Sequence, residues 1–291
     1  MKEDVFFETN ASLLHYLFNT ARFWIPYLQT IFDHLQLIVM RYIIFISLLT
    51  LPFFSVAQKL EGPFKATAAQ YGDINADPLD MMKEQIVKVF KNGYWIATTF
   101  GNSLHPFKGC TGGTYEVKDG KYIEKVDFSS WDSTAVGKVF IFDCKVLPNQ
   151  FAQKGYVNSV KYPNHLVNES YRKISPVYPL NNHSLEGVWF LQSTVWDGDN
   201  PFPNPVTEIK IYTYPRFTWA QYDAATKRFI GAGGGTYRFD GKKLVETIEY
   251  FTYEMALGTE FNVDVQLAPN GTMLQTSWGG RMIETWKKAD R

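Results

Sequence analysis

Four glutamates are the candidate chemical groups of this sequence. Glu124 and Glu246 occupy matching places in two similar stretches of the chain, and Glu169 and Glu284 form a second matching pair. Glu246 lies in an alternating segment, residues 244–250, whose other side chains on the same face are apolar. A carboxylate buried on such a face needs a partner or has a raised pKa.

These glutamates have two interpretations. In the functional one, Glu246 is a polar anchor for a ligand headgroup, or a general acid or base. In the structural one, the glutamate forms an ion pair that closes the fold, and Arg281 and Lys287 near the end of the chain are possible partners. The recurrence of the glutamates in both halves of the chain favours the structural interpretation.

Other catalytic and metal-binding patterns are missing from the sequence. The histidines beyond the leader, His105, His165 and His183, are scattered, which argues against a histidine-based zinc site or dyad. Ser103 does not lie in a Gly-x-Ser-x-Gly motif. The acidic stretch that begins at Asp197 is interrupted by prolines, which favours a solvated turn over a calcium loop. We therefore predict no metal and no cofactor.

Aromatic side chains could line an apolar cavity or simply fill the protein interior. The sequence contains 23 Phe, 17 Tyr and 8 Trp, and small-molecule cavities are lined mainly by apolar and aromatic residues. The residues predicted to bind a ligand all lie in the C-terminal half: Trp219, Tyr222, Tyr237, Glu246, Tyr250, Trp278, Arg281, Glu284 and Trp286.

An internal repeat must position these residues. Residues 109–115, Gly-Cys-Thr-Gly-Gly-Thr-Tyr, match residues 231–237, Gly-Ala-Gly-Gly-Gly-Thr-Tyr, and other short motifs match in the same order along the chain. Collinear matches of this kind indicate a duplication. We predict two homologous domains, residues 58–178 and 183–291, joined by a segment that contains Pro and Asn.

Each repeat is predicted to be all-β. Residues 244–250 and 261–267 alternate as half-buried strands do. Asp119-Gly120 and Asp240-Gly241 are typical of hairpin turns. Many short strands within roughly 110 residues fit a small closed antiparallel barrel. A barrel of eight strands is wide enough to hold one small ligand.

One segment of the first repeat departs from this pattern. Residues Pro78–Val89 are predicted to form a short helix, with Asp77 as its N-cap and Pro78 in its first turn. The predicted fold is therefore two tandem barrels with a short helix in the first.

Several short motifs of the second repeat form a recognisable pattern: Gly187-Val188-Trp189, Trp219-Ala220, Gly233 to Tyr237, Glu246, and Glu284-Thr285-Trp286-Lys287. The first repeat matches this pattern less well, with Gly62-Pro63-Phe64 in place of the usual opening. These motifs resemble those of lipocalin-like secreted bacterial proteins of largely uncharacterised function. The resemblance implies two lipocalin-like barrels and supplies no catalytic residues.

The N-terminal part of the chain is predicted to contain a targeting segment. Residues 40–57 contain a positive residue, Arg41, then an apolar run and a small-residue site ending at Ala57, which is typical of a secretory signal peptide. Residues 1–39 precede it. Either translation starts at Met40, or this extension forms an amphipathic interfacial helix. We expect a secreted or periplasmic protein without a stable membrane anchor after cleavage.

Charge and cysteine content narrow the possible partners. The 29 basic and 29 acidic residues balance, which argues against a nucleic-acid partner. Cys110 and Cys144 both lie in the first repeat of an exported chain, so they could form a disulfide or remain free. The oligomeric state does not follow from the sequence.

The leading hypothesis is a binding protein for a small apolar or amphipathic molecule, held in the second barrel without catalysis. The first alternative is a barrel enzyme, an isomerase, lyase or hydrolase that uses Glu246 as acid or base. The second alternative is a filled barrel that serves as an interaction module without a ligand.

Overall fold

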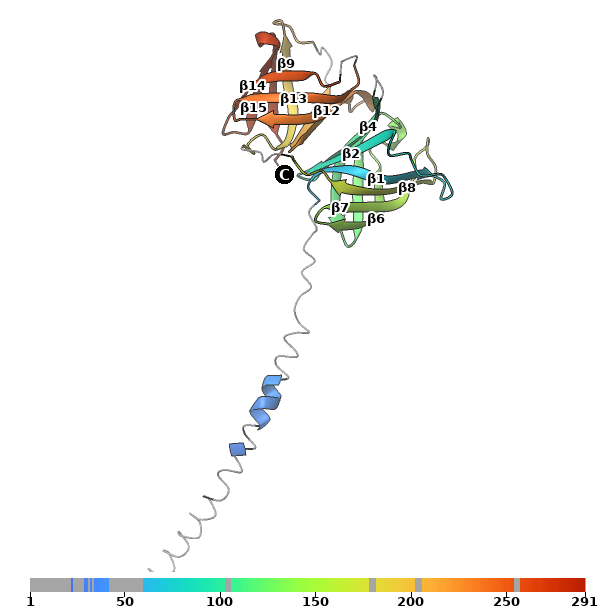
Figure 1. The fold of residues 1–291 in the computed structure, drawn as a ribbon, viewed down its shortest axis with the longest axis vertical. Helices are drawn as coiled ribbons and strands as arrows, with labels where there is room; N and C mark the ends of the chain where they lie inside the picture. Colours follow the sequence, from blue (N-terminus) through green and yellow to red (C-terminus); the bar gives the residue numbers. More distant parts are fainter. Residues whose placement is uncertain are drawn as a thin grey trace, which may run out of the picture. The chain divides into compact units, whose positions relative to one another are not determined.

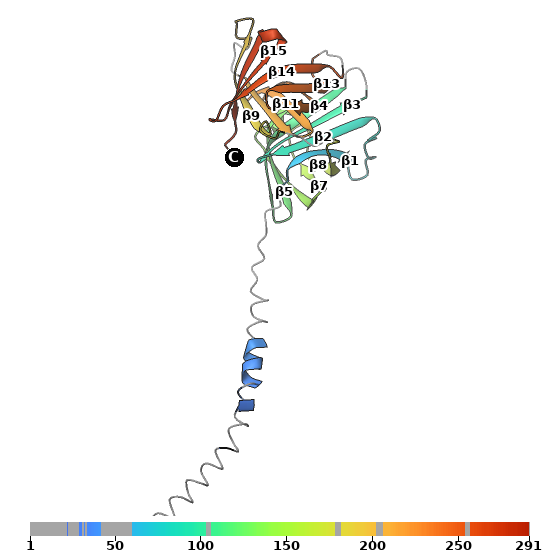
Figure 2. The same cartoon turned by 60° about the vertical axis from the view of Figure 1, so that its left-hand side comes forward.

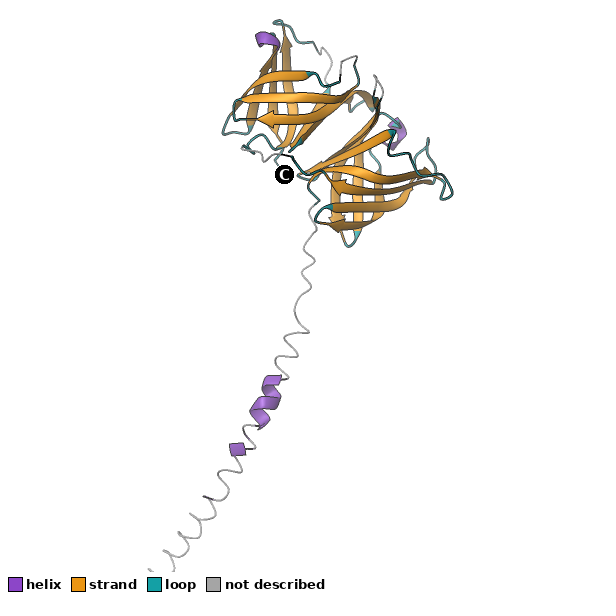
Figure 3. Cartoon of the chain, viewed as in Figure 1, coloured by secondary structure: helices purple, strands orange, loops and turns teal. Residues whose placement is uncertain are grey.

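In the computed structural model, most of the chain from residue 60 onward is described. Positions 22, 29, 30, 32 and 34–41 are also described. The main described segments are residues 60–102, 106–177, 182–201, 206–253 and 257–290. Almost all regular structure in them is β-strand, as Figure 3 shows.

The first barrel is a closed antiparallel meander of eight strands. Each strand pairs with the next, and β1 pairs with β8 to close the cylinder. The strands are coloured blue to yellow-green in Figure 1. They are β1 (Gly62–Gly72), β2 (Glu84–Lys91), β3 (Tyr94–Gly101), β4 (Phe107–Lys118), β5 (Lys121–Ser129), β6 (Val139–Leu147), β7 (Gln150–Val157) and β8 (His165–Lys173).

The second barrel repeats this topology, with β9 paired to β16. Figure 2 shows several of its strands from another side. Its strands are β9 (Gly187–Trp196), β10 (Thr207–Thr213), β11 (Arg216–Asp223), β12 (Arg228–Phe239), β13 (Lys243–Phe251), β14 (Glu260–Leu267), β15 (Thr272–Ser277) and β16 (Met282–Lys288). Single 3₁₀ turns occur in each barrel, η1 (Ser133–Ala135) and η2 (Trp278–Gly280).

The helix predicted in the first barrel is wrong. Asp80 begins a turn, in which its carboxylate accepts from the Met82 amide at 3.0 Å, and β2 starts at Glu84. Both faces of β2 are buried, because one lines the barrel interior and the other contacts the second barrel. Such a strand shows no alternation of apolar and polar residues. The one α-helix among the described residues, 34–41, lies outside the barrels.

Paired glycines let β4 and β12 bend against their neighbours. The β4–β5 register shifts between Gly112 and Gly113, and the β12–β13 register shifts between Gly234 and Gly235. A Cβ on Gly235 would lie 1.9 Å from the carbonyl oxygen of Thr247. No other residue permits this approach, so the glycine repeat fixes the same bend in both barrels.

One closed end of each barrel is plugged by packed rings. In the first barrel Phe90 is fully buried and makes edge contacts with Phe64, Tyr122 and Phe151, with ring centroids 5.6–6.0 Å apart. The second barrel has a corresponding cluster that includes Trp189, Tyr212 and Trp286. The open space of each barrel must therefore lie farther along its strands.

The two barrels share an apolar core between them. Phe100 of β3 stacks on Tyr250 of β13, with ring centroids 4.8 Å apart, and Phe128 of β5 stacks on Tyr222 of β11 at 4.9 Å. Outward-facing residues of β2 and β10, including Val87 and Ile209, are buried in the same cluster. The outer faces of these strands therefore form the contact between the two barrels.

The signal peptide predicted at residues 40–57 lies outside the described residues, apart from Met40 and Arg41. Most of the predicted extension, residues 1–39, also lies outside them. No helix among the described residues is both long enough and apolar enough to cross a membrane.

Candidate functional site

A layer of polar side chains crosses the interior of the first barrel, next to the aromatic plug. Lys88 of β2 is 2% exposed, and its ammonium lies 3.1 Å from Glu124 Oε2 and 3.2 Å from Gln153 Oε1. The Gln153 amide donates to Glu169 at 2.7 Å, and the Tyr71 hydroxyl donates to the same carboxylate. The layer therefore connects one amine and two carboxyls through direct contacts.

Burial shifts the pKa of two groups in this layer, Glu124 and Tyr71. The pKa of Glu124 is raised by burial, although the ammonium of Lys88 opposes the shift. Burial and the neighbouring Glu169 raise the pKa of Tyr71, which stays a hydrogen-bond donor. The Lys88 ammonium also lies 4.4 Å from the ring centroid of Trp95 and 4.6 Å from that of Tyr122. Aromatic faces replace part of the hydration that the buried cation has lost.

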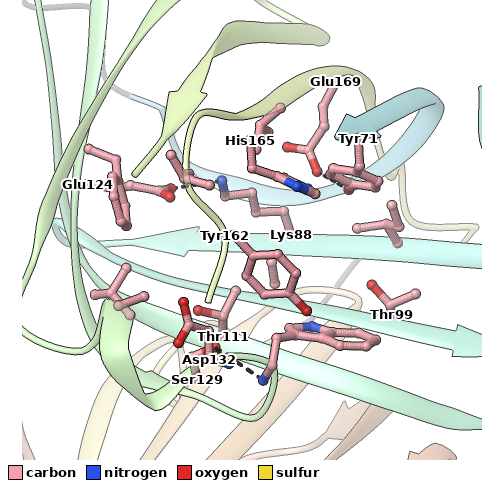
Figure 4. A pocket seen from close by; sticks show the side chains of 18 of the residues that line it. Tyr71, Lys88, Thr99, Thr111, Glu124, Ser129, Asp132, Tyr162, His165 and Glu169 are labelled. Carbon is pink, nitrogen blue, oxygen red and sulfur yellow. Dashed lines mark hydrogen bonds and ion pairs between the residues drawn. The ribbon is translucent and has the colours of Figure 1, made fainter. Parts of the chain in front are cut away.

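A cavity of about 380 Å³ opens above this layer, and Figure 4 shows side chains that line it. This volume falls in the range of small-molecule sites. Lys88, Glu124, Gln153 and Glu169 form its polar end. Its apolar walls come from Leu79, Ile86, Ala97, Val126, Phe140, Val157 and Val167.

The other end of the cavity has a second polar group. Asp132 caps the turn η1 and is 6% exposed, and its Oδ1 accepts from the Thr134 amide at 2.8 Å. Burial alone would raise the pKa of Asp132, but hydrogen bonds from Ser159 and Thr134 outweigh it and hold the pKa below its usual value. Trp131 and Tyr162 line the same cavity. Asp132 is therefore an ionised carboxylate at the cavity wall.

Among the histidines that the structure describes, His165 lines this cavity. Its ring lies 5.0 Å from the ring of Tyr162 and 6.5 Å from that of Tyr71. Partial burial lowers the pKa of His165, so the neutral imidazole is favoured. Among the residues that the structure describes, no group of three or more His, Cys, Asp or Glu could hold a metal ion.

The second barrel contains an equivalent polar layer. The Lys210 ammonium lies 4.0 Å from carboxylate oxygens of both Glu246 and Glu284, and 3.3 Å from Gln275 Oε1. Glu246 also accepts from the Tyr212 hydroxyl at 2.5 Å. Burial alone would lower the pKa of Lys210, but these carboxylates outweigh it and raise the pKa. The lysine therefore remains charged.

A third carboxyl distinguishes this layer from that of the first barrel. Glu208 replaces Ile86 two residues before the lysine, is 8% exposed, and accepts from the Gln221 amide at 3.3 Å. Burial and the nearby Glu284 raise the pKa of Glu208 to about 8. Lys210 thus faces one more acidic group than Lys88 does.

The space above the two layers is filled differently. Lys88 pairs with Ala97 across β2 and β3, whereas Lys210 pairs with Trp219 across β10 and β11. The indole of Trp219 lies over Gly233, where an added Cβ would be 2.6 Å from its Nε1. It also makes an edge contact with Phe251, with ring centroids 5.4 Å apart. A side chain therefore occupies space in the second barrel that is open in the first.

The residues predicted to bind a ligand separate into three groups. Glu246, Glu284 and Trp286 meet around Lys210, and Tyr237 packs in the plug against Tyr212, with Trp219 above them. Tyr222 and Tyr250 lie in the core between the barrels. Trp278 and Arg281 lie at the surface, where Arg281 pairs with Asp197.

Neither predicted partner of Glu246 contacts it in the structure; Lys210 lies near it. Arg281 bonds to Asp197, and the Lys287 ammonium donates to the Asn270 carbonyl at 2.5 Å. The sequence signal for Lys210 was a lone lysine in matching apolar strands, Val-Lys-Val at 87–89 and Ile-Lys-Ile at 209–211. Gln153 and Gln275 also recur in the two barrels, but as single residues they carry little signal.

The two cysteines are free and are not joined in the structure. Cys110 is fully buried in the core between the barrels, whereas Cys144 packs against the interior core of the first barrel. Burial raises the pKa of the Cys110 thiol to about 12. A disulfide does not form because the two side chains belong to different apolar clusters.

Comparisons with known proteins give structural neighbours of low similarity. No protein-family model matches the chain, and no curated protein sequence matches it. The uncharacterized protein YLR301w from Saccharomyces cerevisiae is similar with 10% identity and a TM-score of 0.45, covering 78% of this chain and 97% of its own. A DUF3598-family protein of unknown function from Nostoc punctiforme has 11% identity and a TM-score of 0.23, covering 79% and 96%. These likenesses indicate no function.

Proposed function

We propose that the first barrel binds one small amphipathic molecule in its cavity. The observation that carries this proposal is the space of about 380 Å³ between the Lys88 layer and Asp132, with apolar walls and a polar group at each end. A closed barrel of eight strands is the architecture with which lipocalins hold one small ligand. We therefore place the proposed ligand in the first barrel, whereas the sequence suggested the second.

Burial of apolar ligand surface supplies the binding energy. Apolar surface contributes roughly 25 cal/mol per Å² removed from water, and Ile86, Val126 and Phe140 offer such surface along the cavity. A polar group of the ligand that enters this space loses its hydration, and this is costly unless the group finds a hydrogen-bond partner. The polar ends of the cavity offer such partners and so fix the orientation of the ligand.

A fluorescent probe tests this proposal. N-phenyl-1-naphthylamine, which is neutral and apolar, is titrated into the protein and its emission is followed. We expect saturable binding that is lost when the cavity is filled by Ala97→Trp with Thr111→Gly, which copies Trp219 and Gly233 of the second barrel. Lys154→Trp, at an exposed position of β7, is the matched control and should bind as the parent does.

Two outcomes would overturn the proposal: no saturable binding to the parent, or equal binding to the filled variant. If that variant does not fold, Ala97→Leu fills less of the same space and should still weaken binding. Native mass spectrometry of the purified protein searches for a molecule that is already bound.

Export is part of the proposed function. The support is the signal-peptide pattern of residues 40–57. A binding protein of this kind then acts on molecules outside the cytoplasm. N-terminal sequencing of the exported product should begin at Gln58, and recovery of residues 1–39 on that product would contradict export by this segment.

A further inference from the structure

The charges around the cavity are unequal. Its lining includes one lysine, Lys88, and four carboxyls, which are Glu84, Glu124, Asp132 and Glu169. Partial burial favours the neutral form of His165, the remaining basic side chain of the lining. Acidic groups still outnumber basic ones when Lys108 beside Glu84 and Lys161 near Asp132 are counted, which favours a cation over an anion as ligand.

Three of the four carboxyls already have strong partners. Glu124 contacts Lys88, and Glu169 accepts from Gln153 and Tyr71. Glu84 lies 2.6 Å from the half-exposed ammonium of Lys108. These contacts leave Asp132 as the carboxylate of the lining best able to receive a ligand charge.

Asp132 is held in place by neutral donors. Its Oδ1 accepts from the amide and hydroxyl of Thr134, at 2.8 and 2.6 Å. The exposed Lys161 ammonium donates to the Trp131 carbonyl at 2.6 Å and lies 5.2 Å from the ring centroid of Tyr162, and its charge helps to lower the pKa of Asp132. Figure 4 shows Asp132 beside Ser129 and Thr111, apart from the Glu169–Tyr71 pair. The cavity thus has a fixed carboxylate away from the Lys88 layer.

Aromatic rings accompany this carboxylate. Trp131 and Tyr162 line the cavity together with Asp132. Aromatic faces attract organic cations, more strongly when water is excluded. The combination of a fixed carboxylate and indole and phenol rings matches the needs of an ammonium group.

A second, independent observation points to a ligand in this space. Trp95 also lines the cavity, is 1% exposed, and its indole Nε1 has no hydrogen-bond partner among the described residues. A buried donor without an acceptor is costly. An acceptor atom on a bound molecule would relieve that cost.

We infer that the first barrel selects an organic cation, a protonated amine with a compact apolar body, and that Asp132 receives the ammonium beside the ring of Trp131. The apolar body lies along Ile86, Val126 and Phe140. This inference rests on the proposed function, because it assigns a chemical class to the ligand of the same cavity.

Three probes with one ring system test the assignment. The cation 1-naphthylmethylamine, the neutral 1-naphthalenemethanol and the anion 1-naphthaleneacetic acid are titrated at pH 7 by calorimetry. We expect the amine to bind most tightly, the alcohol less tightly and the acid least, with about tenfold or more between amine and acid, as one partly buried charge contact allows.

Asp132→Asn separates charge from shape. The amide keeps the Oδ1 acceptor for Thr134, so we expect the fold to persist while the affinity for the amine falls about tenfold and that for the alcohol stays nearly unchanged. Asp143→Asn removes one exposed carboxylate of the same barrel and is the matched control, with no expected change in either affinity.

The outcomes distinguish this inference from the proposed function. If the alcohol binds but the acid binds as tightly as the amine, or if Asp132→Asn does not weaken the amine, the assignment of a cation is wrong while the binding cavity stands. If none of the three probes nor N-phenyl-1-naphthylamine binds, both fail.

Discussion

The two barrels share one construction and differ in what fills it. Both contain a buried lysine among two glutamates and a glutamine, next to a plug of aromatic rings. Above this layer the first barrel has Ala97 and a cavity, whereas the second has Trp219. The polar layer therefore does not mark a binding site by itself. The size of the side chains above it decides whether a ligand has room.

A buried cluster of this kind is a weak source of stability. Desolvation of the charges offsets much of their attraction, and the loss of one partner is far more costly than the loss of the whole cluster. The layer occurs in both barrels, although Trp219 occupies the space above it in the second. We interpret it as a device that fixes the packing of the barrel interior.

The largest expected effect comes from removing the lysine of the second barrel. Lys210→Met leaves Glu208, Glu246 and Glu284 without their cation and should lower the free energy of unfolding by about 3–5 kcal/mol. Lys88→Met leaves two glutamates and should cost less. Urea unfolding measures both, with the exposed Lys243→Met as control. Equal stability of Lys210→Met and the parent would show that the layer does not hold the barrel together.

Opening the second barrel should have the next largest effect. Trp219→Ala removes a large side chain that packs on Phe251 and Gly233, and should lower the free energy of unfolding by about 3 kcal/mol. The variant should also gain a cavity that binds N-phenyl-1-naphthylamine. If the variant shows no new binding while it remains folded, the difference between the barrels does not depend on Trp219.

The smallest expected effect, at most about 1.4 kcal/mol for a change of one pH unit, concerns pH. The pKa of Glu208 is about 8 in the folded protein, against 4.5 for an unperturbed glutamate, so the folded state binds the extra proton within this window. Stability should therefore fall as pH rises from about 5 to 8, by up to about 1.4 kcal/mol per pH unit. Glu208→Gln should flatten this part of the profile, as followed by thermal unfolding.

The exposed Glu260→Gln is the control for this measurement and should keep the parent's slope. An unchanged slope in Glu208→Gln would mean that other groups cause the pH dependence. The first barrel has Ile86 at the equivalent position, so the contribution of Glu208 itself belongs to the second barrel.

Some features of the site could be predicted from local patterns. The recurrence of Glu124 and Glu246 on alternating segments indicated inward-facing carboxyls, and both are buried within the barrels. The helix at Pro78–Val89 failed because β2 is buried on both faces, which hides the alternation of a strand. Lys88 and Lys210 were missed because an isolated lysine usually lies at the surface. Their positions follow only from the closed sheet.

The sequence by itself determined the duplication and the strand-rich, barrel-sized character of each half, because turns, glycine motifs and alternation are local signals that survive in both copies. The tertiary structure alone decided which barrel has room for a ligand. That outcome depends on Ala97 opposite Lys88 and on Trp219 opposite Lys210, which are contacts between strands. Whether a side chain fills the interior depends on its neighbours on other strands of the closed barrel. Those neighbours are distant in the sequence, so a local sequence pattern does not reveal them.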